Sequence, residues 1–132
     1  MHPRVEEERD DLATAYPATR YLESPERIET DLELDGRYNR ETSPVAVLVP
    51  AGYRVTGPDG FLIPAGLALK DGTALPVSDA SGLGMPGWLL VSFHFTDASG
   101  RSTWRPTADP QKGDNLLSYL SAIESFLARG CN

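Results

Sequence analysis

Residues 27–38 read RIETDLELDGRY and alternate between apolar and acidic side chains. Strict alternation over eight residues is typical of a strand with one face on the core and the other in water. The inner face would carry Ile28, Thr30, Leu32 and Leu34, and a turn is expected at 35–36. The acidic side chains between them are interpreted as the solvated face of the strand, with an acidic binding surface as the alternative.

Further strands are expected on the C-terminal side of this stretch. Residues 45–49 form a continuous apolar run that stops at Pro50, which indicates a central strand covered on both faces. After the turn-forming sequence GPDG, residues 61–64 are predicted as a short strand. Residues 70–87 are rich in Gly, Pro, Ser and Asp and are expected to form a long surface loop.

The alternation returns in residues 88–95, WLLVSFHF. This pattern predicts a fourth strand, with one face formed by Leu89, Val91, Phe93 and Phe95. A second loop is expected over residues 96–102, ahead of the segment Trp104-Arg105-Pro106.

Helices are expected at both ends of the chain. Residues 4–16 are charge-rich and predict a short, poorly anchored helix or a mobile arm, so residues 1–19 are set apart from a single domain over 20–132. Near the C-terminus, Asp114 is placed to cap a helix and Gly130 to end it. Its apolar residues follow helical spacing: Leu116, Leu120, Ile123 and Leu127. Strands followed by a segregated helix indicate an α+β fold, here a four-stranded antiparallel meander with a long C-terminal helix.

Composition narrows the possible functions. The chain has 132 residues, enough for one domain, and a net charge of −7. Residues 1–41 hold twelve acidic and six basic side chains, a balance of −6. With no basic stripe, binding to nucleic acid or to an anionic membrane is not expected. No apolar run is long enough to span a membrane and the first residues lack a secretion signal, so a cytoplasmic location is expected.

No catalytic, metal or cofactor motif is evident. Cys131 is the single cysteine, which excludes a disulfide or a cysteine-rich zinc site within one chain. The two histidines, His2 and His94, have no partners at a convincing metal-ligand spacing. No Gly-x-Ser-x-Gly sequence occurs, and residues 81–87, SGLGMPG, lack the features of a phosphate-binding loop.

Two local patterns, taken in order, resemble the ubiquitin-conjugating-enzyme superfamily, in particular its divergent bacterial members. The first is VLVPAGYRVTGPDGFLI at residues 47–63, and the second is TWRP at 103–106 followed by a helix. In the first pattern the tyrosine, a proline and the aromatic of the family match Tyr53, Pro58 and Phe61. In the second, Trp104-Arg105-Pro106 resembles the family's Trp-Ser-Pro segment. The resemblance covers roughly residues 20–129.

The resemblance also shows what this chain lacks. His94 stands where the family's His-Pro-Asn begins, but Phe95 and Thr96 replace its proline and asparagine. The family's catalytic cysteine lies between this point and the tryptophan, where residues 95–103, FTDASGRST, contain none. Only a thiolate provides both the nucleophile and the good leaving group of a thioester. Ser99 or Ser102 would form a stable oxyester instead.

The resemblance therefore implies a non-catalytic accessory subunit of a bacterial ubiquitin-like conjugation pathway, of the kind often found in antiviral defence operons. The implied partners are a ubiquitin-like protein and an active conjugating or activating enzyme. Because exposed aromatic side chains make strong binding anchors, six residues are predicted to contact a partner: Tyr53, Phe61, Trp88, His94, Trp104 and Arg105.

Two alternatives stay open. One is an active conjugating enzyme that uses an unorthodox nucleophile, either Cys131 or a serine. The other is a small acidic interaction or immunity protein unrelated to ubiquitin, whose charge would suit a basic partner.

Overall fold

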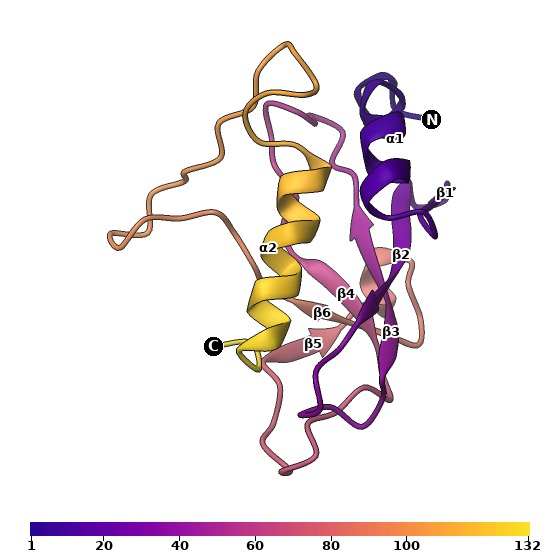
Figure 1. Ribbon diagram of the computed structural model, residues 1–132, viewed down its shortest axis with the longest axis vertical. Coiled ribbons are helices and arrows are strands. Elements are labelled where there is room, and N and C mark those ends of the chain that lie inside the picture. Colours follow the sequence, from indigo (N-terminus) through magenta and orange to yellow (C-terminus); the bar gives the residue numbers. More distant parts are fainter.

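In the computed structural model, which describes residues 1–132, two helices pack with a six-stranded antiparallel sheet (Figure 1). The sheet order is β1-β2-β3-β4-β6-β5. The helices are α1 (Pro3–Ala15) and α2 (Leu116–Ala128), and a short 3₁₀ helix is η1 (Ser81–Leu83). The strands are β1 (Arg20–Leu22), β2 (Arg27–Glu33), β3 (Thr42–Leu48), β4 (Phe61–Pro64), β5 (Val77–Asp79) and β6 (Trp88–Val91). The α+β class is confirmed, but the predicted number of four strands is wrong.

The two additional strands lie at the edges of the sheet. β1 pairs with β2 through three residues, and β5 pairs with β6 through three residues of the segment predicted as a long loop. Three residues are too few to display a recognisable alternation, so the sequence pattern does not reveal them. The strand predicted over 88–95 is also shorter, because its pairing ends at Val91.

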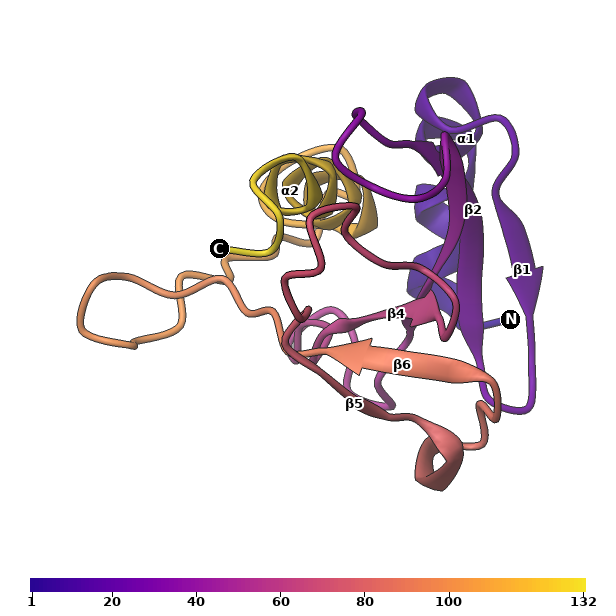
Figure 2. The same ribbon diagram turned by 90° about the horizontal axis from the view of Figure 1, so that it is seen from below.

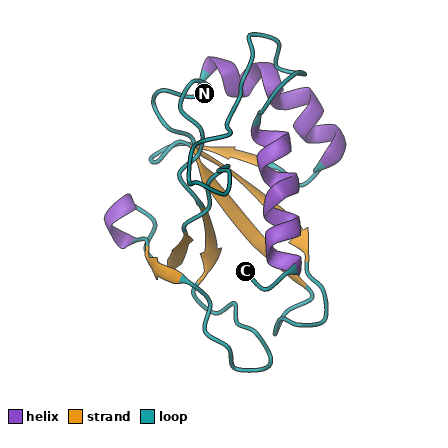
Figure 3. Ribbon diagram, turned by 90° about the vertical axis from the view of Figure 1, so that its left-hand side faces the viewer, coloured by secondary structure: helices purple, strands orange, loops and turns teal.

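The predicted faces of the strands are confirmed. Ile28, Thr30 and Leu32 of β2 are buried, while the acidic side chains between them face outward. β3 is covered on both sides, because Val45 and Val47 belong to the main core and Ala46 belongs to a second cluster on the outer face. Figure 2 shows the sheet curling around α2, and Figure 3 shows α2 lying across it. The main core therefore lies between the inner face of the sheet and the helices.

The segment between β5 and β6 covers part of the outer face. Ala80 and Met85 from this segment pack with Ala46 and Leu62 in the second cluster. Three partly buried residues complete it: Leu48, Trp88 and Leu90. The Gly- and Pro-rich stretch is thus only partly a solvent-exposed loop, because two of its side chains are buried against the sheet.

Helix α2 follows its predicted apolar spacing, with its four predicted core residues all buried. Its N-cap is Asn115 and not Asp114: the Asn115 side chain accepts a hydrogen bond from the Ser118 N–H at 2.7 Å. The Ser118 hydroxyl accepts the Asn115 N–H in return, which forms a capping box. Asp114 instead accepts the backbone N–H of Arg105 at 2.8 Å. At the other end, Gly130 terminates the helix as predicted, with a φ of +72°.

Helix α1 is packed into the protein, which corrects the expectation of a poorly anchored helix or mobile arm. Val5 and Leu12 are buried in the main core, and the charged side chains of Arg4 and Glu8 are buried as well. The sequence suggested weak anchoring because most of α1 is charged, but two of these charges face the interior. Neither helix is long and apolar enough to cross a membrane.

Candidate functional site

A cleft of about 340 Å³ opens beside the segment that follows β6. Ligand sites in proteins commonly occupy roughly 300–1,000 Å³, so this cleft is large enough to receive a partner side chain or a small ligand. It is lined by the turn before β4, the segment after β6 and the first turn of α2. The lining residues are Gly57, Pro58, His94, Phe95, Thr96, Gly100, Ser102, Trp104 and Tyr119.

The wall of the cleft is aromatic and firmly held. Trp104 is 9% exposed, and its ring centroid lies 5.6 Å from that of Phe95 and 6.4 Å from that of Tyr119. The Trp104 indole N–H donates to the backbone carbonyl of Arg54 at 2.7 Å. The Tyr119 hydroxyl donates to the Phe93 carbonyl at 2.7 Å. These contacts give the cleft a rigid apolar side against which a partner could pack.

A polar pair lies at the mouth of the cleft. His94 Nε2 and Asp59 Oδ1 are 2.5 Å apart, and both side chains are exposed. Exposed polar pairs contribute little to stability, so His94 and Asp59 matter mainly as a polar rim of the cleft. Neither nearby serine is bonded to His94: Ser99 donates to Asp97, and Ser102 accepts the N–H of Trp104. The structure therefore contains no serine–histidine pair of the kind that nucleophilic catalysis requires.

The loop over residues 96–103 projects from the body of the protein and is exposed throughout (Figures 1 and 2). Its order comes from Asp97, whose Oδ1 accepts the Ser99 hydroxyl at 2.7 Å and the N–H groups of Ser99 and Arg101. The hydrogen bond from the Ser99 hydroxyl is the main cause that lowers the pKa of Asp97. A bridge between Thr96 and Ser102 closes the base of the loop.

We expect Ser99→Ala to raise the pKa of Asp97 toward its ordinary value of 3.8, as measured by NMR titration of the carboxyl carbon. A lowered pKa means that folding favours the ionised carboxylate. The contribution of ionised Asp97 to folding stability is therefore present above pH 3.8, and it is lost as the pH falls through the lower pKa of the folded state. Ser121→Ala, an exposed change on α2, is the control. An unchanged Asp97 titration in Ser99→Ala would contradict the assignment.

Cys131 lies beyond the far end of α2. The cleft contacts α2 at Tyr119, and the nine residues from there to the last residue of the helix, Ala128, span about 14 Å along the axis. Cys131 is buried, and this burial raises the pKa of its thiol. In this structure the thiol is therefore neither near the cleft nor activated as a nucleophile.

This burial predicts slow alkylation of Cys131 in the native protein. At pH 8 a raised pKa leaves less thiolate, and the surrounding side chains restrict access to it. We expect iodoacetamide to modify the native protein much more slowly than the protein unfolded in urea, followed by mass spectrometry. Equal rates in the two states would show that the thiol is accessible in the native fold.

The structure brings together some of the six predicted partner-binding residues. Trp104 and His94 line the cleft, Tyr53 is buried behind Trp104, and Arg105 is exposed at the base of the projecting loop. The Arg105 guanidinium donates to the carbonyls of Ser102 and Trp104.

The other two predicted residues lie outside the cleft. Phe61 offers no exposed surface in this structure, because β4 directs it into the core, where it is fully buried beside the stacked rings of Phe93 and Phe126. Trp88 lies on the outer face of the sheet.

Sequence reasoning does not identify most of the cleft lining, and two of the missed residues are polar: Tyr119 in the wall, and Asp59, which lies outside the lining and pairs with His94 at the mouth. Tyr119 has helical spacing and was interpreted as part of the helix packing, and Asp59 belongs to a sequence that signals only a turn. No local pattern distinguishes either of them as a binding residue.

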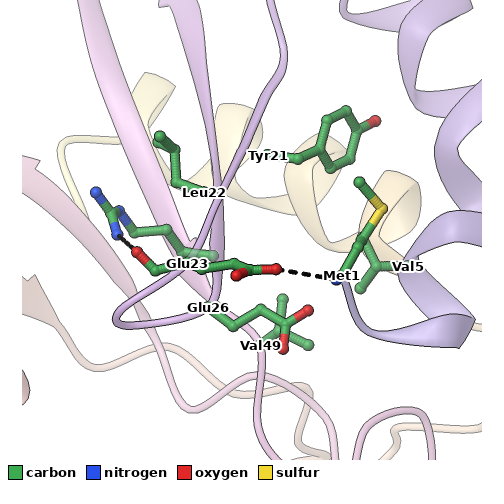
Figure 4. Close-up of a pocket in the computed structure, with 8 residues that line it drawn as sticks. Met1, Val5, Tyr21, Leu22, Glu23, Glu26 and Val49 are labelled. Atoms are coloured by element: carbon green, nitrogen blue, oxygen red, sulfur yellow. Dashed lines mark hydrogen bonds and ion pairs between the residues drawn. The ribbon is translucent and has the colours of Figure 1, made fainter.

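A second hollow lies between the start of α1 and the β1–β2 hairpin (Figure 4). Its charged groups already have partners: Glu23 accepts the N-terminal ammonium group at 3.0 Å, and Glu26 accepts the backbone N–H of His2. At about 50 Å³ it is much smaller than the roughly 300 Å³ of common ligand sites. The cleft beside Trp104 is therefore the stronger candidate.

No group of three or more His, Cys, Asp or Glu side chains is arranged to hold a metal ion. Comparisons with protein-family models, with curated proteins and with solved structures find no match. The function is therefore inferred from the residues and geometry of this chain.

Proposed function

We propose that the protein is a non-catalytic, ubiquitin-conjugating-enzyme-like binding subunit of a bacterial ubiquitin-like conjugation pathway in the cytoplasm, such as one in antiviral defence. The cleft carries this proposal. The resemblance would place a catalytic cysteine between His94 and Trp104, and both of these residues line the cleft. The cleft has an aromatic wall on which a partner could pack, but it contains no thiol. The order of helix, antiparallel meander and helix also agrees with the resemblance, with β1 and β5 as additions at the sheet edges.

The cleft and the projecting loop beside it would form the contact surface. The aromatic wall offers apolar area, while His94 at its rim and Arg105 at the base of the neighbouring loop offer exposed polar groups. Interfaces gain most of their affinity from such desolvated aromatic and arginine contacts. The proposed partners are a ubiquitin-like protein and an active conjugating or activating enzyme.

Calorimetric titration of the purified chain with the ubiquitin-like protein and conjugating enzyme encoded nearest its gene tests the proposal. We expect one of them to bind, and we expect His94→Ala and Arg105→Ala to weaken that binding by about tenfold each. Arg40→Ala is the matched control, since Arg40 is also exposed and lies away from the cleft. The proposal would be refuted if neither protein bound, or if Arg40→Ala weakened binding as much as His94→Ala and Arg105→Ala do.

The active-enzyme alternative has its own test. The activated ubiquitin-like protein should form no adduct with this chain that a reducing agent cleaves, because Cys131 is buried away from the cleft. A reducible adduct that disappears in Cys131→Ser would establish catalysis.

A second candidate function is an acidic interaction protein that binds a basic partner. Exposed carboxylates support it, since Glu6, Glu7 and Asp10 project from α1 and Asp31 and Glu33 project from β2. Charged surfaces of this kind mainly accelerate association. The association rate with a basic protein would then fall steeply as salt is added, and a salt-independent rate would exclude this candidate.

A further inference from the structure

We infer that the start of α2 carries a carboxylate-binding site that the chain fills with Glu8 of α1, and that this contact positions the Trp104 wall of the cleft. Glu8 is 2% exposed. Its Oε1 accepts the backbone N–H of Leu116, the first residue of α2, at 2.7 Å. Its Oε2 accepts Arg4 Nε at 2.8 Å, and the Tyr53 hydroxyl lies 3.0 and 2.8 Å from the two oxygens.

The donors around Glu8 together form a site suited to an anion. The first N–H groups of a helix attract negative charge, and the hydroxyl of Tyr53 and the guanidinium of Arg4 add donors from two other directions. The site is sealed from water, because Arg4 is 6% exposed and Tyr53 is buried. A carboxylate in this site accepts hydrogen bonds from all of these donors. An empty site would leave several buried donors without an acceptor, which costs free energy.

Arg4 provides an independent sign that this is a ligand site. Its Nη1 donates to the carbonyls of Thr107 and Ala108, but its Nη2 is buried and has no partner. By the covalent geometry of arginine, Nη2 lies on the same edge as Nε, the edge that a carboxylate can bind with both oxygens. Glu8 uses only Nε on this edge, so the site offers one more donor than its present occupant takes.

Two chains of contacts connect the site to the cleft. The Tyr53 ring centroid lies 6.2 Å from that of Trp104, and the indole N–H is held by Arg54, the next residue. On the other side, Arg4 holds Thr107 and Ala108, which closely follow Trp104 in the chain. Glu8 and Arg4 are therefore positioning residues that fix both segments supporting the indole.

The importance of the cleft rests on the proposed function, but the carboxylate site can be tested without any partner. Glu8→Ala removes the carboxylate and leaves its donors in place, so free acetate should refill the site. Thermal unfolding at pH 7 is compared in sodium acetate and in sodium chloride of equal ionic strength. We expect Glu8→Ala to lower the Tm by roughly 10 °C in chloride. Acetate at ten times its dissociation constant should recover about 5 °C.

The position of Trp104 is followed in the same samples. In a Trp88→Phe background, Trp104 is the only tryptophan, and acrylamide quenching reports its exposure. We expect Glu8→Ala to increase the quenching and acetate to reverse the increase. A merely structural role of α1 would produce no response to acetate.

Glu7→Ala is the matched control, because Glu7 is the exposed neighbour of Glu8 on the same helix. It should leave the Tm, the quenching and the acetate response as in the wild type. If Glu8→Ala does not fold in chloride, recovery of folding in acetate alone supports the site. Glu8→Gln, which keeps the shape without the charge, should give an intermediate Tm and intermediate quenching.

Three results would overturn the inference. The first is a fall in Tm in Glu7→Ala as large as that in Glu8→Ala. The second is a Glu8→Ala protein whose Tm and quenching are the same in acetate as in chloride. The third is a Glu8→Gln protein whose Tm and quenching are unchanged from the wild type. None of these measurements involves a partner, so failure of the proposed function leaves them unaffected.

Discussion

Phe61→Ala is expected to lower the free energy of unfolding by about 3–5 kcal/mol. Phe61 is 0% exposed, and its ring centroid lies 6.0 Å from that of Phe93 and 6.3 Å from that of Phe126. Truncation removes the buried ring and leaves a cavity between β4 and α2, which a well-packed core fills only in part. Because small domains are stable by only about 5–15 kcal/mol, this loss should be evident as a much lower urea midpoint.

Val55→Ala is the control for this experiment, since Val55 is 80% exposed. We expect it to change stability by no more than about 0.5 kcal/mol. A similarly small change in Phe61→Ala would show that Phe61 is not the core residue that the structure describes. It would also reopen the prediction from sequence that Phe61 contacts a partner.

The sequence predicts the central part of the fold well. The alternation in β2 and the apolar run in β3 place their side chains correctly, because burial imposes a period of two on one strand and continuous apolar residues on the other. The same rule assigns Phe93 and Phe95 to the inner side, although pairing stops at Val91. Periodicity thus reports which way a side chain faces more reliably than where a strand ends.

The site is harder to predict, because its residues meet only after folding. Glu8 contacts Leu116, 108 residues away, and no short motif encodes that distance. The one available signal is the helical spacing of Arg4, Glu8 and Leu12, which places them on one face of α1. Composition obscures this signal, because residues 4–16 are charge-rich and nothing in the sequence separates Glu8 from its neighbours Glu6 and Glu7, which are exposed. Glu8 is buried, and its burial can be explained only after folding has brought together the groups that donate hydrogen bonds to it.

Gly60→Ala is the second change with a large expected effect, a loss of about 3 kcal/mol or more in the free energy of unfolding. Gly60 has a φ of +132°, a conformation that residues with a Cβ rarely adopt. A Cβ at this position would also lie 2.4 Å from the backbone carbonyl oxygen of Val91. Since that oxygen belongs to the neighbouring strand β6, it cannot move without disturbing the pairing of β4 and β6.

Gly66→Ala provides the comparison, because a Cβ there meets nothing within 4 Å and its φ is not in the strained positive range. That change should be neutral or stabilising by less than about 1 kcal/mol. Gly60 directly follows Asp59, so its displacement should also separate Asp59 from His94, which the His94 imidazole resonances would report in NMR spectra. Equal stability of the two variants would contradict the close approach of Gly60 to β6. A large loss with unchanged His94 resonances would instead show that the rim of the cleft is held independently of this turn.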